Sequence, residues 1–121
     1  MKFTAKQANS TVKITIQNGN PVVNGLKYKL QNGNWQNYTI DTVITLQNVD
    51  DYVLFKNTEN NLSTSTSDTV KFVMNGTIES SGSIQSLLNY SDNCQNCCFF
   101  GLFSNCTSLI TCPQLPATNL A

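Results

Sequence analysis

The sequence predicts a mainly β protein whose residues 1–82 form a small antiparallel β-sandwich or barrel. Apolar and polar residues alternate with a period of two, which places successive side chains on opposite faces of a strand. Turn-forming residues recur about every 8–12 residues, a spacing typical of small sandwiches and barrels. A helical period is not visible before residue 83.

Each expected strand is marked by apolar residues at every second position, and about six or seven short strands result. In chain order they lie around residues 11–16, 26–30, 35–40, 44–46, 52–55, 70–74 and 77–79. In the first of these, Val12, Ile14 and Ile16 share the face expected to be buried. This pattern favours a core built from alternate residues of several short strands.

The connections between the expected strands are polar. Asn32-Gly33 and Asn75-Gly76 are dipeptides that favour tight turns with positive φ, so each is expected to join two strands. Residues 57–67 are small and polar, which indicates a long loop or a weak edge.

The composition argues against several functional classes. The chain of 121 residues has no His and no Arg, and its seven Lys balance seven Asp plus Glu, so the net charge is zero. The commonest general base and metal ligand is therefore missing, and so is the bidentate clamp for phosphate. We expect no catalytic activity, no cofactor, no metal and no basic stripe that could follow a nucleic acid.

The N-terminus lacks the apolar stretch of a signal peptide, and no segment approaches membrane-spanning length. We therefore expect no membrane insertion. The protein would reach the outside either after removal of a leader or by cell lysis with a virus particle.

The character of the chain changes after the polar segment 80–83. We interpret residues 83–97 as a linker or N-terminal cap, and residues 98–121 as a unit rich in Phe, Leu, Pro and Cys. Phe99, Phe100 and Phe103 suit one or two helical turns. Apolar residues then recur at every third position, at Leu109, Cys112 and Leu115.

Residues 98–121 resemble one unit of the BspA-type leucine-rich repeat proteins of gut Bacteroidetes and their phages. The matching residues are Cys98, Phe99, Phe100, Leu102, Phe103, Cys106, Thr107, Ser108, Leu109, Pro113, Leu115, Pro116, Ala117, Thr118, Leu120 and Ala121. Cys112 departs from the family, which usually has Ala there. Segments 73–78 and 81–89 are similar to the small β-domain that precedes such arrays. The resemblance implies the first repeat of a truncated solenoid, which cannot bury its apolar face alone, and a surface-displayed recognition protein.

All five cysteines lie in the tail, at Cys94, Cys97, Cys98, Cys106 and Cys112. A four-thiolate zinc site is conceivable, but the spacing is not that of a zinc finger or ribbon. Packing of Cys98, Cys106 and Cys112 as small apolar core residues is the favoured interpretation. A disulfide that involves Cys94 or Cys97, which lie outside the repeat motif, is a separate possibility.

Two other groups of residues are candidate sites. Trp35 and Tyr38 flank the first expected hairpin and could form an aromatic platform for a sugar ring, although packing of Trp35 in the core is favoured. Asn48, Asp50 and Asp51 supply oxygen atoms that could bind Ca²⁺, but three such neighbours more often form a polar turn.

The leading functional hypothesis is a non-catalytic recognition or adhesion module, extracellular and displayed on a bacterial cell surface or a phage particle. Its partners would be a protein or glycan on a host or neighbouring cell, and a homo-oligomer is a further possibility. The alternative is a structural virion component, a tail or head appendage whose β-domain anchors it to the particle and contacts other virion proteins. A glycan-active enzyme is disfavoured, because the acidic residues are scattered and lie mostly in turns.

Overall fold

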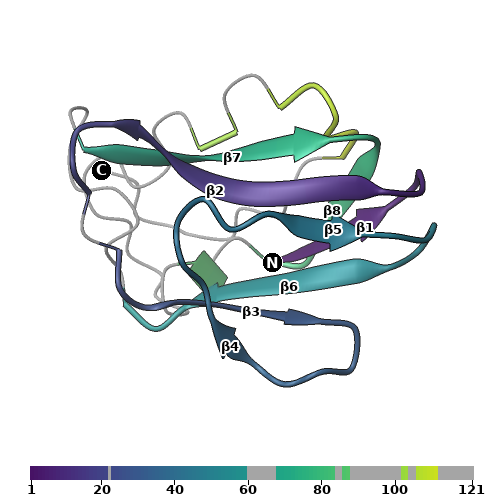
Figure 1. Cartoon of the computed structure of the whole chain (residues 1–121), viewed down its shortest axis with the longest axis horizontal. Helices are drawn as coiled ribbons and strands as arrows, with labels where there is room; N and C mark the ends of the chain where they lie inside the picture. Colours follow the sequence, from purple (N-terminus) through teal and green to yellow (C-terminus); the bar gives the residue numbers. More distant parts are fainter. Residues whose placement is uncertain (22, 60–67, 84–85, 88–101, 104–105, 112–121) are drawn as a thin grey trace.

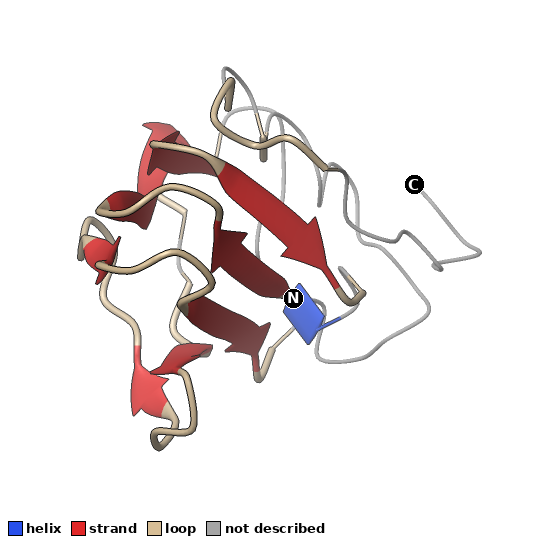
Figure 2. Cartoon of the chain, turned by 90° about the vertical axis from the view of Figure 1, so that its right-hand side faces the viewer, coloured by secondary structure: helices blue, strands red, loops and turns tan. Residues whose placement is uncertain are grey.

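The computed structural model of the chain describes residues 1–21, 23–59, 68–83, 86–87, 102–103 and 106–111, which form two antiparallel sheets (Figure 1). The strands are β1 (Lys2–Ala5), β2 (Ser10–Asn18), β3 (Leu26–Leu30), β4 (Gln36–Asn37), β5 (Ile44–Leu46), β6 (Tyr52–Asn57), β7 (Thr69–Asn75) and β8 (Ile78–Ser81). Apart from a short helical turn at residues 86–87, the described residues form strands and loops (Figure 2).

Five strands make one sheet in the order β4-β3-β6-β1-β8, and three make the other in the order β5-β2-β7. The regular elements are strands, so the predicted mainly β class is confirmed. The two sheets do not close on each other, so the arrangement is a sandwich rather than a barrel. A leucine-rich repeat solenoid is not among the elements that the described residues form. Residues 112–121 of the predicted repeat lie outside them.

Strand β2 shows why alternation alone misplaced one core residue. Val12 and Ile14 are fully buried as expected, but Ile16 is 42% exposed. β5 pairs with β2 only from Ser10 to Val12, so the far end of β2 extends beyond its neighbour on that side. The register with β7 also shifts between Ile16 and Asn18. The alternation therefore places Ile16 on the same face of β2 as Val12 and Ile14, but Ile16 lies beyond the part of β2 that β5 accompanies and stays exposed.

The first predicted hairpin is much reduced. The positive φ expected at Asn32-Gly33 occurs at Gln31 instead, with a φ of 49°, and the Gly33 N–H donates to the Leu30 carbonyl over 2.8 Å. The return strand expected at residues 35–40 shrinks to Gln36–Asn37. The second turn is confirmed at Gly76, whose φ is 92° and whose missing Cβ leaves room for Ser10.

The core lies between the two sheets and is centred on aromatic rings. Phe3 of β1 contacts Phe72 of β7 edge to face at 5.0 Å between ring centroids, and Phe55 of β6 at 6.0 Å. All three rings are buried. Burying such a side chain contributes roughly 1.5–3 kcal/mol, so this cluster helps to hold the five-stranded sheet against the three-stranded one.

Described residues of the tail complete this core. Leu87 and Leu102 are buried in it, and Phe103 stacks on Phe72 with centroids 5.3 Å apart. The Phe72 N–H donates to the Leu102 carbonyl over 2.7 Å, and Leu109 forms a parallel bridge with Ile78. These contacts occupy hydrogen-bonding positions on β7 and β8. The described parts of the expected linker and repeat therefore pack directly on the β-domain.

Candidate binding face on the five-stranded sheet

The outer face of the five-stranded sheet gathers lysines from three adjacent strands. Val53 and Phe55 of β6 point into the core, so Tyr52, Leu54 and Lys56 point outward. The register places Lys27 opposite Lys56 and sets both Lys29 and Lys2 opposite Leu54. We call this surface the lysine face: it consists of Lys2, Lys27, Lys29 and Lys56, with Trp35, Tyr52 and Leu54 among them.

Trp35 lies at the surface, in contact with two of these lysines. Its side chain is 37% exposed, and the Nζ atoms of Lys56 and Lys29 lie 4.1 Å and 5.4 Å from the centroid of its ring. Both distances fall in the range of cation–π attraction. The favoured interpretation of Trp35 as a core residue is therefore wrong. Trp35 precedes the two-residue strand β4 at the sheet edge, where no second layer covers it.

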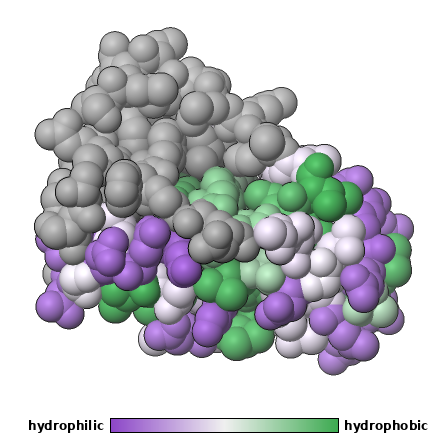
Figure 3. Space-filling view, turned by 90° about the horizontal axis from the view of Figure 1, so that it is seen from above, coloured by the Kyte–Doolittle hydropathy of each residue, from purple (hydrophilic) through white to green (hydrophobic). Residues whose placement is uncertain are grey.

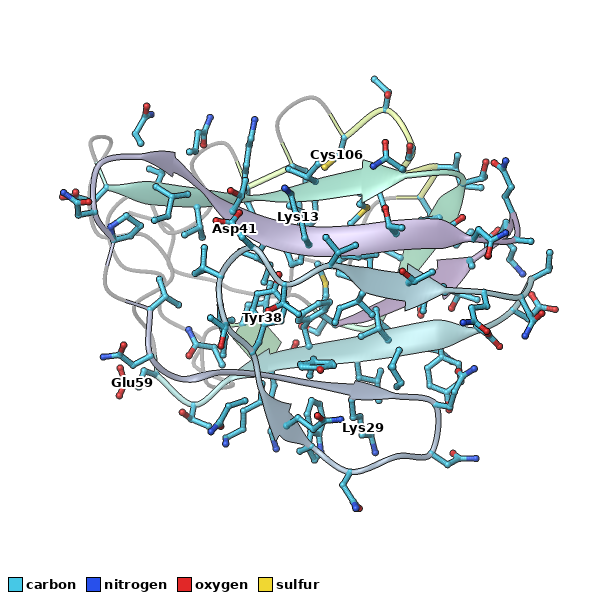
Figure 4. The ribbon with its side chains drawn as sticks, viewed as in Figure 1. Lys13, Lys29, Tyr38, Asp41, Glu59 and Cys106 are labelled. Atoms are coloured by element: carbon cyan, nitrogen blue, oxygen red, sulfur yellow. The ribbon has the colours of Figure 1, made fainter. Side chains whose placement is uncertain are left out.

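Tyr38, rather than Trp35, is the aromatic residue of this segment that lies in the core. It is buried, and its hydroxyl accepts the Ile14 N–H over 2.7 Å and donates to the Thr42 carbonyl over 2.6 Å. Burial raises the pKa of this hydroxyl. In Figure 4, Tyr38 lies between β2 and β6, whereas Lys29 lies on β3 at the lower edge of the molecule. The structure thus separates the two aromatic residues predicted to act together.

In the described part of the chain, no carboxylate lies within ion-pair distance of the lysines of the lysine face, although Glu79 lies on the same side of the sheet, opposite Thr4. The two ion pairs found within the described part of the chain both use Lys6, which contacts Asp50 at 2.8 Å and Glu79 at 3.7 Å. Lys27 instead donates to Asn37 Oδ1 over 2.6 Å, and Lys2 lies 4.2 Å from the centroid of Tyr52. Like charges directly opposite on neighbouring strands repel each other. The face therefore has unneutralised charge that favours anions.

This clustering corrects one expectation. The zero net charge and the lack of Arg predicted no basic stripe, yet strand pairing brings four of the seven lysines together. The order of the strands in the sheet brings these lysines together, and the sequence does not specify that order. A partial signal existed, because Lys27, Lys29 and Lys56 alternate in the sequence with apolar or aromatic residues.

The acidic cluster weighed as a calcium site is a turn. Asp50 has a φ of 74° and pairs with Lys6. The Asp51 carboxylate accepts the Asn48 N–H over 3.0 Å and Gln31 Nε2 over 2.7 Å. Across the described residues, no group of three or more Cys, Asp and Glu comes together to hold a metal. The turn interpretation accounts for these carboxylates.

An open depression of about 230 Å³ lies beside this turn, away from the lysine face. It is lined by Leu30, Gln31, Thr45, Leu46, Gln47 and Asp51. Gln31 bonds both to Asp51 and to the Tyr52 N–H, over 2.8 Å. Because these polar groups bond to one another, the depression is a weaker candidate than the lysine face.

Cys106 is the described member of the cysteine cluster. It is partly buried, and its Sγ donates to the Phe72 carbonyl over 3.0 Å. Burial raises the pKa of this thiol, and the nearby charge of Lys71 opposes that shift to a smaller extent. Cys106 thus packs against the core as a partly buried residue. Cys94, Cys97, Cys98 and Cys112, and with them the expected disulfide, lie outside the described residues.

Comparison of the chain with protein-family models, curated proteins and solved structures gave no match. In the part of the chain that the structure describes, no helix has the length and apolar character to cross a membrane. A functional conclusion therefore has to come from the residues and their geometry.

Proposed function

We propose that this protein is a non-catalytic recognition module that binds the surface of another cell through its lysine face. The observation that carries the proposal is the half-exposed ring of Trp35 in contact with two ammonium groups on an open sheet. Such a surface offers an apolar plane and positive charge together, which suits binding from outside rather than enclosure of a small substrate.

The groups on the face support binding rather than catalysis. Its polar side chains are lysine ammonium groups, the Tyr52 hydroxyl and the neighbouring amide of Asn37, which is opposite Lys27. None of these is a carboxylate or imidazole, the groups that most often act as general bases. Glu79, a carboxylate on the same outer face of the sheet, pairs with Lys6. Asp50 and Asp51 are engaged in the turn after β5.

The setting that we propose is extracellular, on a bacterial cell surface or a phage particle, with a protein or glycan of another cell as partner. The resemblance of residues 98–121 to BspA-type repeats supports this setting. The surface chemistry agrees with it, because Asn, Ser, Thr and Gln fill roughly two-fifths of the sequence while charged residues make up 12%. In Figure 3, hydrophilic and hydrophobic residues are interleaved on the described surface seen from above.

Binding of the labelled whole chain to a panel of intact gut Bacteroidetes cells tests the proposal, with flow cytometry as the measurement. We expect at least one strain to bind, and the triple variant Lys29→Gln, Trp35→Ala, Lys56→Gln to lose most of that signal. The matched control is Lys13→Gln with Lys71→Gln, which removes two charges from the outer face of the other sheet. No binding to any strain, or equal loss in the control, would contradict the proposal.

A further inference from the structure

We infer that the ligand of the lysine face is a polysaccharide that carries carboxylate or sulfate groups. This inference rests on the proposed function and names the chemical class of its partner.

The charge pattern points to an anionic ligand. Lys27 and Lys56 face each other across β3 and β6, and Lys29 and Lys56 approach the same indole ring. Each arrangement brings like charges together, at a cost to the free protein. A bound anion neutralises this repulsion, so the face gains more from an anionic ligand than isolated lysines would.

The layout of the charges points to an extended ligand. The four lysines belong to β1, β3 and β6, which are adjacent in the order β3-β6-β1. Neighbouring strands lie about 4.8 Å apart, so the face crosses roughly 10 Å of sheet. One small anion cannot reach both Lys2 and Lys27, whereas a chain with repeated anionic groups can contact them in series.

The aromatic and amide groups of the face point to sugar units. Trp35 and Tyr52 present ring surfaces against which the C–H faces of sugar rings can pack. Asn37 on the neighbouring edge strand is opposite Lys27 on the same face, and its exposed amide can bond hydroxyl groups. Because the lysine side chains are long and lie at the surface, they can move off the rings onto the ligand's anions.

Other polyanions fit less well. Nucleic acid is disfavoured because the chain has zero net charge and no Arg for its phosphates. An acidic peptide usually needs side-chain pockets or a strand edge. None of the residues that line the depression beside the turn belongs to the lysine face, and the edge strand beside the face, β4, is only two residues long. Both remain as outcomes of the test.

Calorimetry with five polymers provides the test on the whole chain. Dextran sulfate and unmodified dextran share a backbone and differ in charge; polygalacturonate supplies carboxylates in place of sulfates. Poly-glutamate and single-stranded poly-dT are the acidic peptide and the nucleic acid. We expect binding to dextran sulfate, polygalacturonate or both, and none to dextran, with affinity that falls as salt rises. Binding to poly-glutamate or poly-dT at least as tight as to the acidic polysaccharides would overturn the inference, as would no binding to either polysaccharide.

Variants locate the site. Lys29→Gln with Lys56→Gln is expected to weaken binding roughly tenfold, since two exposed charge contacts with the ligand are lost. Trp35→Ala is expected to weaken it about fivefold through loss of ring contact. The control Lys13→Gln with Lys71→Gln should stay within about twofold of the unmodified chain. Urea unfolding of each variant checks that it folds, and equal weakening in the control would overturn the assignment.

Competition on cells separates the two proposals. If cells bind through the lysine face and soluble acidic polysaccharide does not displace the protein, the ligand class is wrong and the recognition function stands. If acidic polysaccharides bind the face but no cell does, the ligand class stands and the recognition function fails.

Discussion

At the scale of single residues, Tyr38 satisfies a backbone group of the sandwich that strand pairing leaves without a partner. Its hydroxyl accepts the Ile14 N–H at a point where β5 no longer pairs with β2, and the Asp41 N–H bonds the Ile14 carbonyl over 2.8 Å. The loop that contains Tyr38 thus replaces a missing strand partner. A buried backbone group left without a partner costs about 1–3 kcal/mol.

Tyr38→Phe is expected to reduce the free energy of unfolding by about 1–3 kcal/mol, because it leaves the Ile14 N–H unbonded without opening a cavity. Urea unfolding followed by circular dichroism measures the change. Tyr28→Phe is the control, since the Tyr28 ring contacts Tyr38 at 5.8 Å but its hydroxyl is not needed for that contact. Equal loss in the two variants would contradict this role of the Tyr38 hydroxyl.

The same hydroxyl predicts a dependence on alkaline pH. Its ordinary pKa is 10.0, and burial raises the pKa in the folded state. Below pH 10 both states keep the proton and the contribution of Tyr38 is complete. Above pH 10 the unfolded state loses its proton first, so stability falls until the folded-state pKa is passed. Tyr38→Phe should therefore lose less stability between pH 9 and pH 11 than the unmodified chain; an unchanged slope would contradict this account.

At the scale of elements, the described tail residues cover the side of the sandwich formed by β7 and β8. Backbone bonds from Phe72 to Leu102 and between Ile78 and residues 108 and 110 occupy donors and acceptors of both strands. Edge strands left open can pair with other chains. The tail therefore protects this side as well as filling the core.

Phe103→Ala tests the contribution of the tail to the core. Phe103 stacks on Phe72 and contacts Phe3 at 6.4 Å, so its removal leaves a cavity beside both rings. We expect a loss of about 2–4 kcal/mol in the free energy of unfolding, measured with urea. Ile110→Ala is the control in the same segment, because Ile110 is 54% exposed and its backbone bond survives the change. A loss below about 0.5 kcal/mol for Phe103→Ala would show that the tail adds little.

At the scale of the whole molecule, sheet order creates the lysine face and sets its energetics. Lys56→Gln removes repulsion from Lys27 and also the cation–π contact with Trp35. These effects are each about 0.5–1 kcal/mol and oppose each other. The free energy of unfolding should therefore change by less than about 0.5 kcal/mol, as measured with urea. A decrease of more than about 1.5 kcal/mol in the free energy of unfolding would mean that the main role of Lys56 is to stabilise the fold rather than to bind a ligand.

Much of the fold was predictable from local pattern. Alternation located most of the strands, and Gly76 marked the second turn, because the period of two and the freedom of glycine act within a few residues. The expectation failed at Asn32-Gly33 and Ile16, where the outcome depended on the length of a neighbouring strand. The candidate site was half predicted: Trp35 was singled out, but with Tyr38 as its companion rather than Lys29 and Lys56.

The sequence by itself determined the mainly β class, the apolar faces of most strands and the lack of His and Arg, since all three depend on residue type and on spacing within one segment. Only the tertiary structure decided that the sheets stay open, that Trp35 is exposed while Tyr38 is buried, and that Lys2, Lys27, Lys29 and Lys56 share a face. The physical reason is strand pairing: it brings residues far apart in the chain to about 5 Å from each other, and no local pattern specifies which strands become neighbours.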